Sequence, residues 1–204
     1  MSKFLKRVET RRSAAIQWLH ENGGGHLVSS IDELLTPLPR DEFVQAFKVG
    51  FEEGLHFCLA HPEICALEYS WYYGGSETGE ALAYGYDSIN TKGTLDKYDL
   101  GPEGLPGVEM KATFGSIIEE YFAAIPTHKA INRYVEAIRP RAQELSSDAV
   151  DLTIDLINLW NYQIAIDVFE SLIPVDLIEQ LTNRQLWVVL RRQGRPAVPV
   201  AFIK

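Results

Sequence analysis

The chain has 204 residues and a mass of 23.0 kDa, with 46% hydrophobic and 23% charged residues, which is typical of one folded domain and not of a disordered chain. Its formal net charge is -9 at pH 7, and residues 26–110 alone contain fifteen Asp and Glu against four Lys and Arg. Nucleic-acid sites need a surplus of Lys and Arg, so this charge argues against nucleic acid. It favours a basic partner, or it serves only to keep the protein soluble.

The N-terminus and the apolar segments predict where the protein resides. Residues 1–13 are charged and amphipathic and lack the apolar centre of a signal peptide. No apolar run approaches the roughly 20 residues that cross a bilayer. We therefore expect a cytoplasmic protein with no membrane partner, in which Cys58 and Cys65 are free thiols because the compartment is reducing.

A helix and a glycine-rich joint are expected at the N-terminus. Apolar residues at spacings of three, four and seven predict an amphipathic helix over 3–21, with Ser2 as its cap. The three glycines at 23–25 end this helix and predict a flexible joint. This pattern divides the chain into an N-terminal helix and joint over 1–25 and a single α+β domain over 26–204.

A second helix and a hairpin follow. After a short helical turn at 30–35, one apolar face predicts a helix over 41–59. The pattern then changes to period two, with apolar and aromatic residues alternating over 67–73 and again over 82–86. Two strands joined by a glycine-rich loop predict a β-hairpin over about 64–86.

The middle of the chain is expected to be a long loop followed by helices. Residues 87–112 contain several Gly and Pro and lack sustained periodicity, so we expect a long loop, of the kind that is often functional or partly mobile. Apolar spacing predicts one helix over 114–125 and another from Thr127 that bends or ends near Pro140. A third helix, over 147–172, is apolar around most of its circumference and should be largely buried.

The C-terminal segment returns to strands. A short helix over 177–181 precedes apolar runs at 186–190 and 198–203, which predict a terminal hairpin with Pro199 on an edge strand. The strands are grouped in hairpins and are not separated by crossover helices. We therefore expect a helix-rich α+β domain whose mainly antiparallel sheet is built from hairpins at about 64–86 and 186–203.

An acidic, tyrosine-rich surface is the first candidate site. Tyr offers a large contact area with a polar edge, and surrounding carboxylates would attract a basic protein. On the first hairpin, Tyr69, Trp71 and Tyr73 alternate toward the core, which leaves Tyr72 on the outer face. The predicted partner-binding residues on this hairpin and the following loop are Tyr72, Glu77, Glu80, Asp87, Asp96 and Asp99.

A divalent-metal site is the alternative. Asp148, Asp151 and Asp155 recur at i, i+3 and i+7 on one predicted helix, and Mg²⁺ or Mn²⁺ prefers such oxygen ligands. Glu119 and Glu120, on the predicted helix over 114–125, could supply a facing acidic pair, although that helix lacks a matching acidic repeat. Cys58, His61, Cys65 and the nearby His56 have no second Cys/His pair of the kind a zinc site uses.

The sequence thus predicts a cytoplasmic, non-enzymatic protein-binding module without a cofactor. One concrete form is an acidic, immunity-type inhibitor that covers the cationic active site of a basic toxin or enzyme. A hydrolase that uses Mg²⁺ or Mn²⁺ through helical carboxylates is the alternative, and an aromatic-lined small-molecule binding protein is a third hypothesis. No pattern in the sequence indicates an oligomeric state.

Overall fold

The computed structural model describes residues 2–71, 81–94, 102, 104–123, 134, 136–192 and 196–204. Six helices lie within these ranges. They are α1 (Lys3–Glu21), α2 (Gly25–Leu35), α3 (Arg40–Ala60), α5 (Arg139–Leu145), α6 (Ser147–Leu172) and α7 (Val175–Glu179). Among the described helices, none combines the length and apolar character needed to cross a membrane.

The described strands form two sheets. They are β1 (Ala66–Trp71), β2 (Ala81–Tyr86), β3 (Ile89–Thr94), β4 (Met110–Phe114), β5 (Ile117–Ala123), β6 (Leu186–Arg192) and β7 (Val198–Ile203). The larger sheet has the order β5-β2-β1-β6-β7, and β3 pairs with β4 in a separate two-stranded sheet. The combination of helices and sheets confirms the predicted α+β class.

The large sheet is mixed, which differs from the predicted sheet in detail. Both predicted hairpins are present, since β1 pairs antiparallel with β2 and β6 pairs antiparallel with β7. They are joined by a parallel pair, β1 with β6, and β5 adds to the outside of β2. Alternation within a strand indicates which face is buried but not which strand lies beside it. Neither the β1–β6 pair nor the β2–β5 pair could therefore be predicted.

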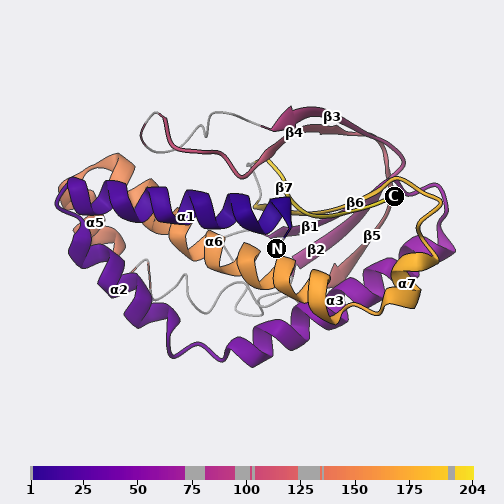
Figure 1. Ribbon diagram of the computed structural model, residues 1–204, viewed down its shortest axis with the longest axis horizontal. Helices are drawn as coiled ribbons and strands as arrows, with labels where there is room; N and C mark the ends of the chain where they lie inside the picture. The colour runs from indigo at the N-terminus through magenta and orange to yellow at the C-terminus, as the bar shows by residue number, and fades with distance from the viewer. Residues whose placement is uncertain are drawn as a thin grey trace.

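The helices pack on one face of this sheet and share one hydrophobic core with it. Figure 1 shows α6 crossing the middle of the molecule, with α1 beside it and the sheet behind. Phe51 of α3 lies at the centre of this core, in edge-to-face contact with Tyr69 of β1 and Phe169 of α6 at 5.4 Å from each ring. The predicted orientation of Tyr69 toward the core is therefore confirmed, and its hydroxyl donates to the Gly50 carbonyl at 2.7 Å.

Serine caps fix the starts of the two helices that pack most closely. The Ser2 hydroxyl accepts from Phe4 N and Leu5 N, at 3.2 and 3.1 Å, and begins α1 as predicted. Ser146 does the same for α6 by accepting from Ala149 N at 3.1 Å. Residues of α1 and α2 belong to the same core cluster as those of α3 and α6.

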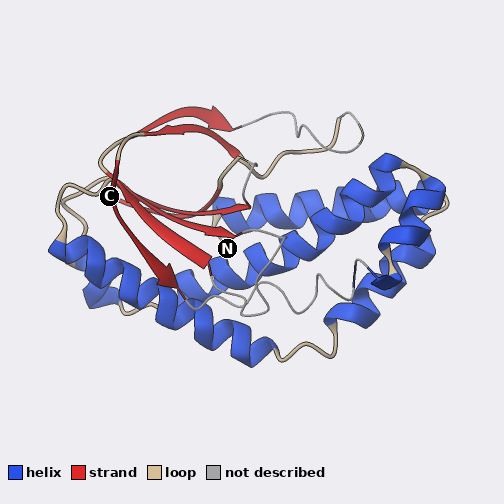
Figure 2. Cartoon of the chain, turned by 180° about the vertical axis from the view of Figure 1, so that it is seen from behind, coloured by secondary structure: helices blue, strands red, loops and turns tan. Residues whose placement is uncertain are grey.

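The β3–β4 hairpin covers the opposite face of the sheet. Seen from behind, the hairpin lies over the sheet on the side away from the helices (Figure 2). A second, smaller apolar cluster forms beneath it from Met110, Val189 and Ala197, with Trp187 and Phe114 packed against them. Met110 of β4 also bridges to Ala197, just before β7, through a 2.8 Å hydrogen bond from its N–H.

Two predictions for the middle of the chain are wrong. Residues 87–112 are not a continuous loop, because β3 and the start of β4 lie within them. The described part of the predicted helix over 114–125, residues 114–123, forms the end of β4 and the strand β5, separated by a turn at Gly115. A Cβ at Gly115 would displace the Asp87 carboxylate and the Ser88 hydroxyl, so a larger residue would disturb this turn. Most of the helix predicted from Thr127 lies outside the described residues.

Candidate functional site

A buried ion pair lies between the large sheet and the hairpin that covers it. Glu68 of β1 points to the hairpin side, and its side chain is 0% exposed. Arg191 of the neighbouring strand β6 places its Nε 3.0 Å from Glu68 Oε1, and its side chain is 31% exposed. These two atoms are in ionic contact but not in hydrogen-bond alignment. The pair therefore joins a fully buried carboxylate to a guanidinium group that is partly exposed to solvent.

Aromatic side chains of β2 and β4 pack close to this ion pair. The Phe114 ring of β4 lies 4.8 Å from the Tyr86 ring, and the Arg191 guanidinium carbon lies 5.7 Å from the centre of the same Phe114 ring. Tyr84 lies beside Tyr86, with 6.2 Å between ring centres. Arg191 thus contacts both the Glu68 carboxylate and the hairpin residue Phe114.

Burial changes the acid strength of these groups. Desolvation raises the pKa of Glu68 above its usual range, although the charge of Arg191 opposes the shift. The pKa of Tyr86 is raised to about 12, chiefly by burial and then by the charge of Glu68. A carboxyl of this kind is suited to proton transfer in an open cleft, but Glu68 has no exposed surface. In the structure its carboxylate contacts Arg191, which in turn packs against Phe114 of the hairpin.

The edge strand β5 carries an exposed surface that is both acidic and apolar. Ile117 and Ile118 are 51% and 37% exposed, and Glu119 and Glu120 are both exposed. Glu119 lies opposite Gly85 and Glu120 opposite Tyr84 in the β2–β5 pair, so the two carboxylates leave on opposite faces of the sheet. We call Glu63, Asp87, Ile117, Ile118, Glu119 and Glu120 the β5 edge surface.

Two further carboxylates extend this surface beyond the strand. His61, at the end of α3, lies 3.4 Å from both Glu63 and Glu119. A backbone hydrogen bond is the main cause that lowers the pKa of Glu63. Asp87 follows β2 and accepts from Ser116 N at 2.9 Å, which places it at the turn that begins β5. Asp87 is thus the one predicted partner-binding residue that the structure describes.

The remaining predicted partner-binding residues cannot be placed. Tyr72, Glu77, Glu80, Asp96 and Asp99 all lie outside the described residues. They remain predictions from the sequence.

The aspartate stripe of α6 is present, but its members have different surroundings. Asp155 is buried against Arg11 of α1, with 2.7 Å between its Oδ2 and Arg11 Nε, and Arg11 is itself 0% exposed. Asp148 lies at the start of α6, and Glu119 and Glu120 lie on the sheet edge and not on a facing helix. Over the described residues, no group of three or more His, Cys, Asp or Glu side chains is placed to hold a metal ion.

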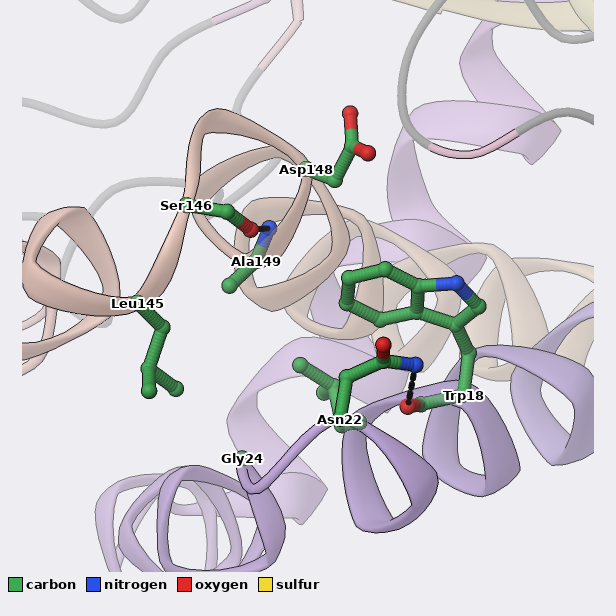
Figure 3. Close-up of a pocket in the computed structure, with 8 residues that line it drawn as sticks. Trp18, Asn22, Gly24, Leu145, Ser146, Asp148 and Ala149 are labelled. Carbon is green, nitrogen blue, oxygen red and sulfur yellow. Dashed lines mark hydrogen bonds between the residues drawn. The ribbon is translucent and has the colours of Figure 1, made fainter.

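A small cavity lies between the end of α1 and the start of α6 (Figure 3). It has a volume of about 200 Å³, and its lining includes Trp18, Asn22, Ser146 and Asp148. Two of its polar side chains already have local partners, since Asn22 Nδ2 donates to the Trp18 carbonyl at 2.9 Å and Ser146 caps α6. In Figure 3 the Asp148 carboxylate points away from the Trp18 indole. The cavity offers little that is directed at a ligand.

The cysteines take no part in these sites. Cys58 and Cys65 are both free, as predicted. Burial raises the pKa of the Cys58 thiol to about 12, so it is not an activated nucleophile.

Comparisons with protein-family models, with curated proteins and with solved structures gave no match for this chain. The β5 edge surface and the Glu68–Arg191 pair are therefore interpreted from their own geometry. Glu68 was missed as a site residue because the hairpin that buries it lies in the segment predicted to be a loop. The alternation of Glu68 with Leu67 and Tyr69 indicated only a face turned away from the core.

Proposed function

We propose that the protein is a non-enzymatic binding module that binds a basic protein through the β5 edge surface. The observation that carries this proposal is the exposure of Ile117 and Ile118 beside the carboxylates of Glu119 and Glu120 on one edge strand. Exposed apolar residues supply contact area, and the carboxylates around them favour a cationic partner over a neutral one.

The charge of the whole chain supports the same partner. A net charge of -9 repels other acidic molecules and raises the rate at which a basic protein meets this surface. An immunity-type inhibitor is one concrete form of the proposal, in which the β5 edge surface covers a cationic active site in a toxin or another enzyme. The residues predicted from the sequence but not described, Tyr72 and Glu80 among them, lie on the β1–β2 connection and would extend the contact.

Charge reversal on β5 tests the proposal. We expect the double substitution Glu119→Lys and Glu120→Lys to abolish capture of a basic partner from a lysate of the cells that express the protein. Removing two favourable charge contacts and adding two repulsive ones should weaken binding by at least about 100-fold, since each close pair contributes on the order of 1.5 kcal/mol or more. The measurement is quantitative affinity capture with identification of the bound protein, at low and at raised salt.

The matched control changes the same charge elsewhere. Glu33 of α2 and Glu144 of α5 are exposed, and both helices lie at the opposite end of the molecule from β5 (Figure 1). Glu33→Lys with Glu144→Lys should leave capture unchanged at moderate salt. If both double variants weaken capture equally, the net charge and not the β5 edge surface selects the partner. If neither does, the proposal is wrong.

A further inference from the structure

We infer that the partner supplies an extended basic segment that pairs with β5 as an additional strand of the large sheet. This inference rests on the proposed function and specifies how the β5 edge surface is used. Strand addition takes its affinity from main-chain hydrogen bonds and its selectivity from alternate side chains.

The first argument is the open edge of β5. The strand pairs with β2 from Ala123 back to Ile117, and no other described strand pairs with its outer side. Within the part of the chain that the structure describes, its outward N–H and C=O groups therefore have no strand to pair with, as in any edge strand.

The second argument is a contrast between the two edges of the same sheet. The other edge strand, β7, contains Pro199, has an irregular register where it pairs with β6 at Val188 and Val189, and is bridged by β4 just before it begins. Proline, irregular register and covering by another segment are the usual devices that stop an edge from pairing with another chain. β5 contains no proline, and although its register with β2 also shifts, between Gly85 and Tyr86, it is regular from Glu119 to Ala123. Of the two edges of the large sheet, as far as the structure describes them, β5 is therefore the one better suited to accept a strand.

The third argument is charge, which selects the occupant. A second copy of the chain that paired through β5 would bring its own Glu119 and Glu120 close to the same two residues, and like charges across strands are destabilising. A basic segment replaces this repulsion with attraction. Because Glu119 and Glu120 leave on opposite faces of the sheet, the complementary strand needs cations on both of its faces, which means two consecutive Lys or Arg residues.

A pair of synthetic peptides tests the inference directly. The probe is an acetylated and amidated peptide of sequence TVKKVT, which has two consecutive lysines between β-branched residues. The control is TPKKPT, which has the same charge but cannot form the ladder because proline lacks an N–H. We expect TVKKVT to bind the full chain at least tenfold more tightly than TPKKPT. We also expect it to slow hydrogen exchange at least tenfold at alternate backbone amides within residues 117–123, measured by NMR.

The outcomes separate strand addition from simple electrostatic attraction. Equal binding of the two peptides, or no slowing of β5 amides at millimolar TVKKVT, overturns the inference. Either result leaves the proposed function standing if capture of the natural partner still depends on Glu119 and Glu120. Slowing that persists in the Glu119→Lys, Glu120→Lys variant would show that charge does not select the strand, which also overturns the inference.

Discussion

Replacing Asp155 with alanine should destabilise the protein by about 3–5 kcal/mol, the usual cost of removing one member of a buried ion pair. The substitution leaves the Arg11 guanidinium, which is 0% exposed, without the carboxylate that lies 2.7 Å from it. An arginine side chain cannot relieve this cost by losing its proton, so the loss should be nearly independent of pH between 5 and 8. For a chain of this size, the melting temperature should fall by roughly 6 to 20 °C.

Two companion variants make this result specific. Asp148→Ala on the same helix should cost less than about 1 kcal/mol, because Asp148 is only partly buried and acts mainly at the helix start. The double variant Arg11→Met with Asp155→Leu should recover most of the stability, since apolar side chains of similar volume often replace a buried pair without loss. Urea denaturation measures all three. A small effect of Asp155→Ala would show that the α1–α6 interface does not depend on the pair.

Replacing Arg191 with methionine should destabilise the protein by at most about 3 kcal/mol at pH 7, because the parent chain already bears part of the cost of burying Glu68, and by less than about 1 kcal/mol at pH 5. The substitution leaves Glu68 buried without its cation, but a carboxyl can take up a proton, which limits the cost. From the usual value of 4.5, protonation at pH 7 costs about 3.4 kcal/mol, at 1.36 kcal/mol per pH unit.

The direction of this pH dependence follows from the raised pKa of Glu68. A carboxyl whose pKa is higher in the folded state binds its proton more tightly there, so stability falls as the pH rises above 4.5 toward the raised value. The fall should be larger in Arg191→Met than in the parent chain, and urea denaturation at several pH values measures it. Glu68→Gln should cost less than about 1 kcal/mol at pH 7, because Arg191 keeps part of its contact with water. An equal loss in both variants would contradict this account.

The helices and the two hairpins could be predicted because their patterns are local. The helix at 147–172 begins and ends where its apolar pattern does, and the Ser2 cap lies where the sequence indicated. β5 was mistaken for a helix because Ile117, Ile118, Tyr121 and Phe122 follow a helical spacing, whereas the strand exposes the two isoleucines at an edge. Gly115 was the signal that the segment turns there and does not continue as one element.

The candidate site could be predicted only in part, since it depends on contacts between distant segments. The excess of acidic residues over 26–110 could be read from the sequence, and so could the choice of Asp87 as a member of the acidic surface. The ion pairs Glu68–Arg191 and Arg11–Asp155 join residues far apart along the chain, and no periodicity within one segment indicates such partners. The metal interpretation grouped Asp155 with Asp148 from spacing alone, whereas Arg11 is the partner that the fold gives to Asp155.

The parallel pair at the centre of the sheet affects how the protein folds during synthesis. Ala66 of β1 pairs with Trp187 of β6, so β1 has only β2 beside it until β6 has left the ribosome. At 5–20 residues per second, translation of the intervening segment takes roughly 6 to 24 s. During that interval Leu67 and Tyr69 lie on a strand with one unpaired side, which exposes the nascent chain to aggregation. The central part of the large sheet can therefore form only after β6 has been synthesised.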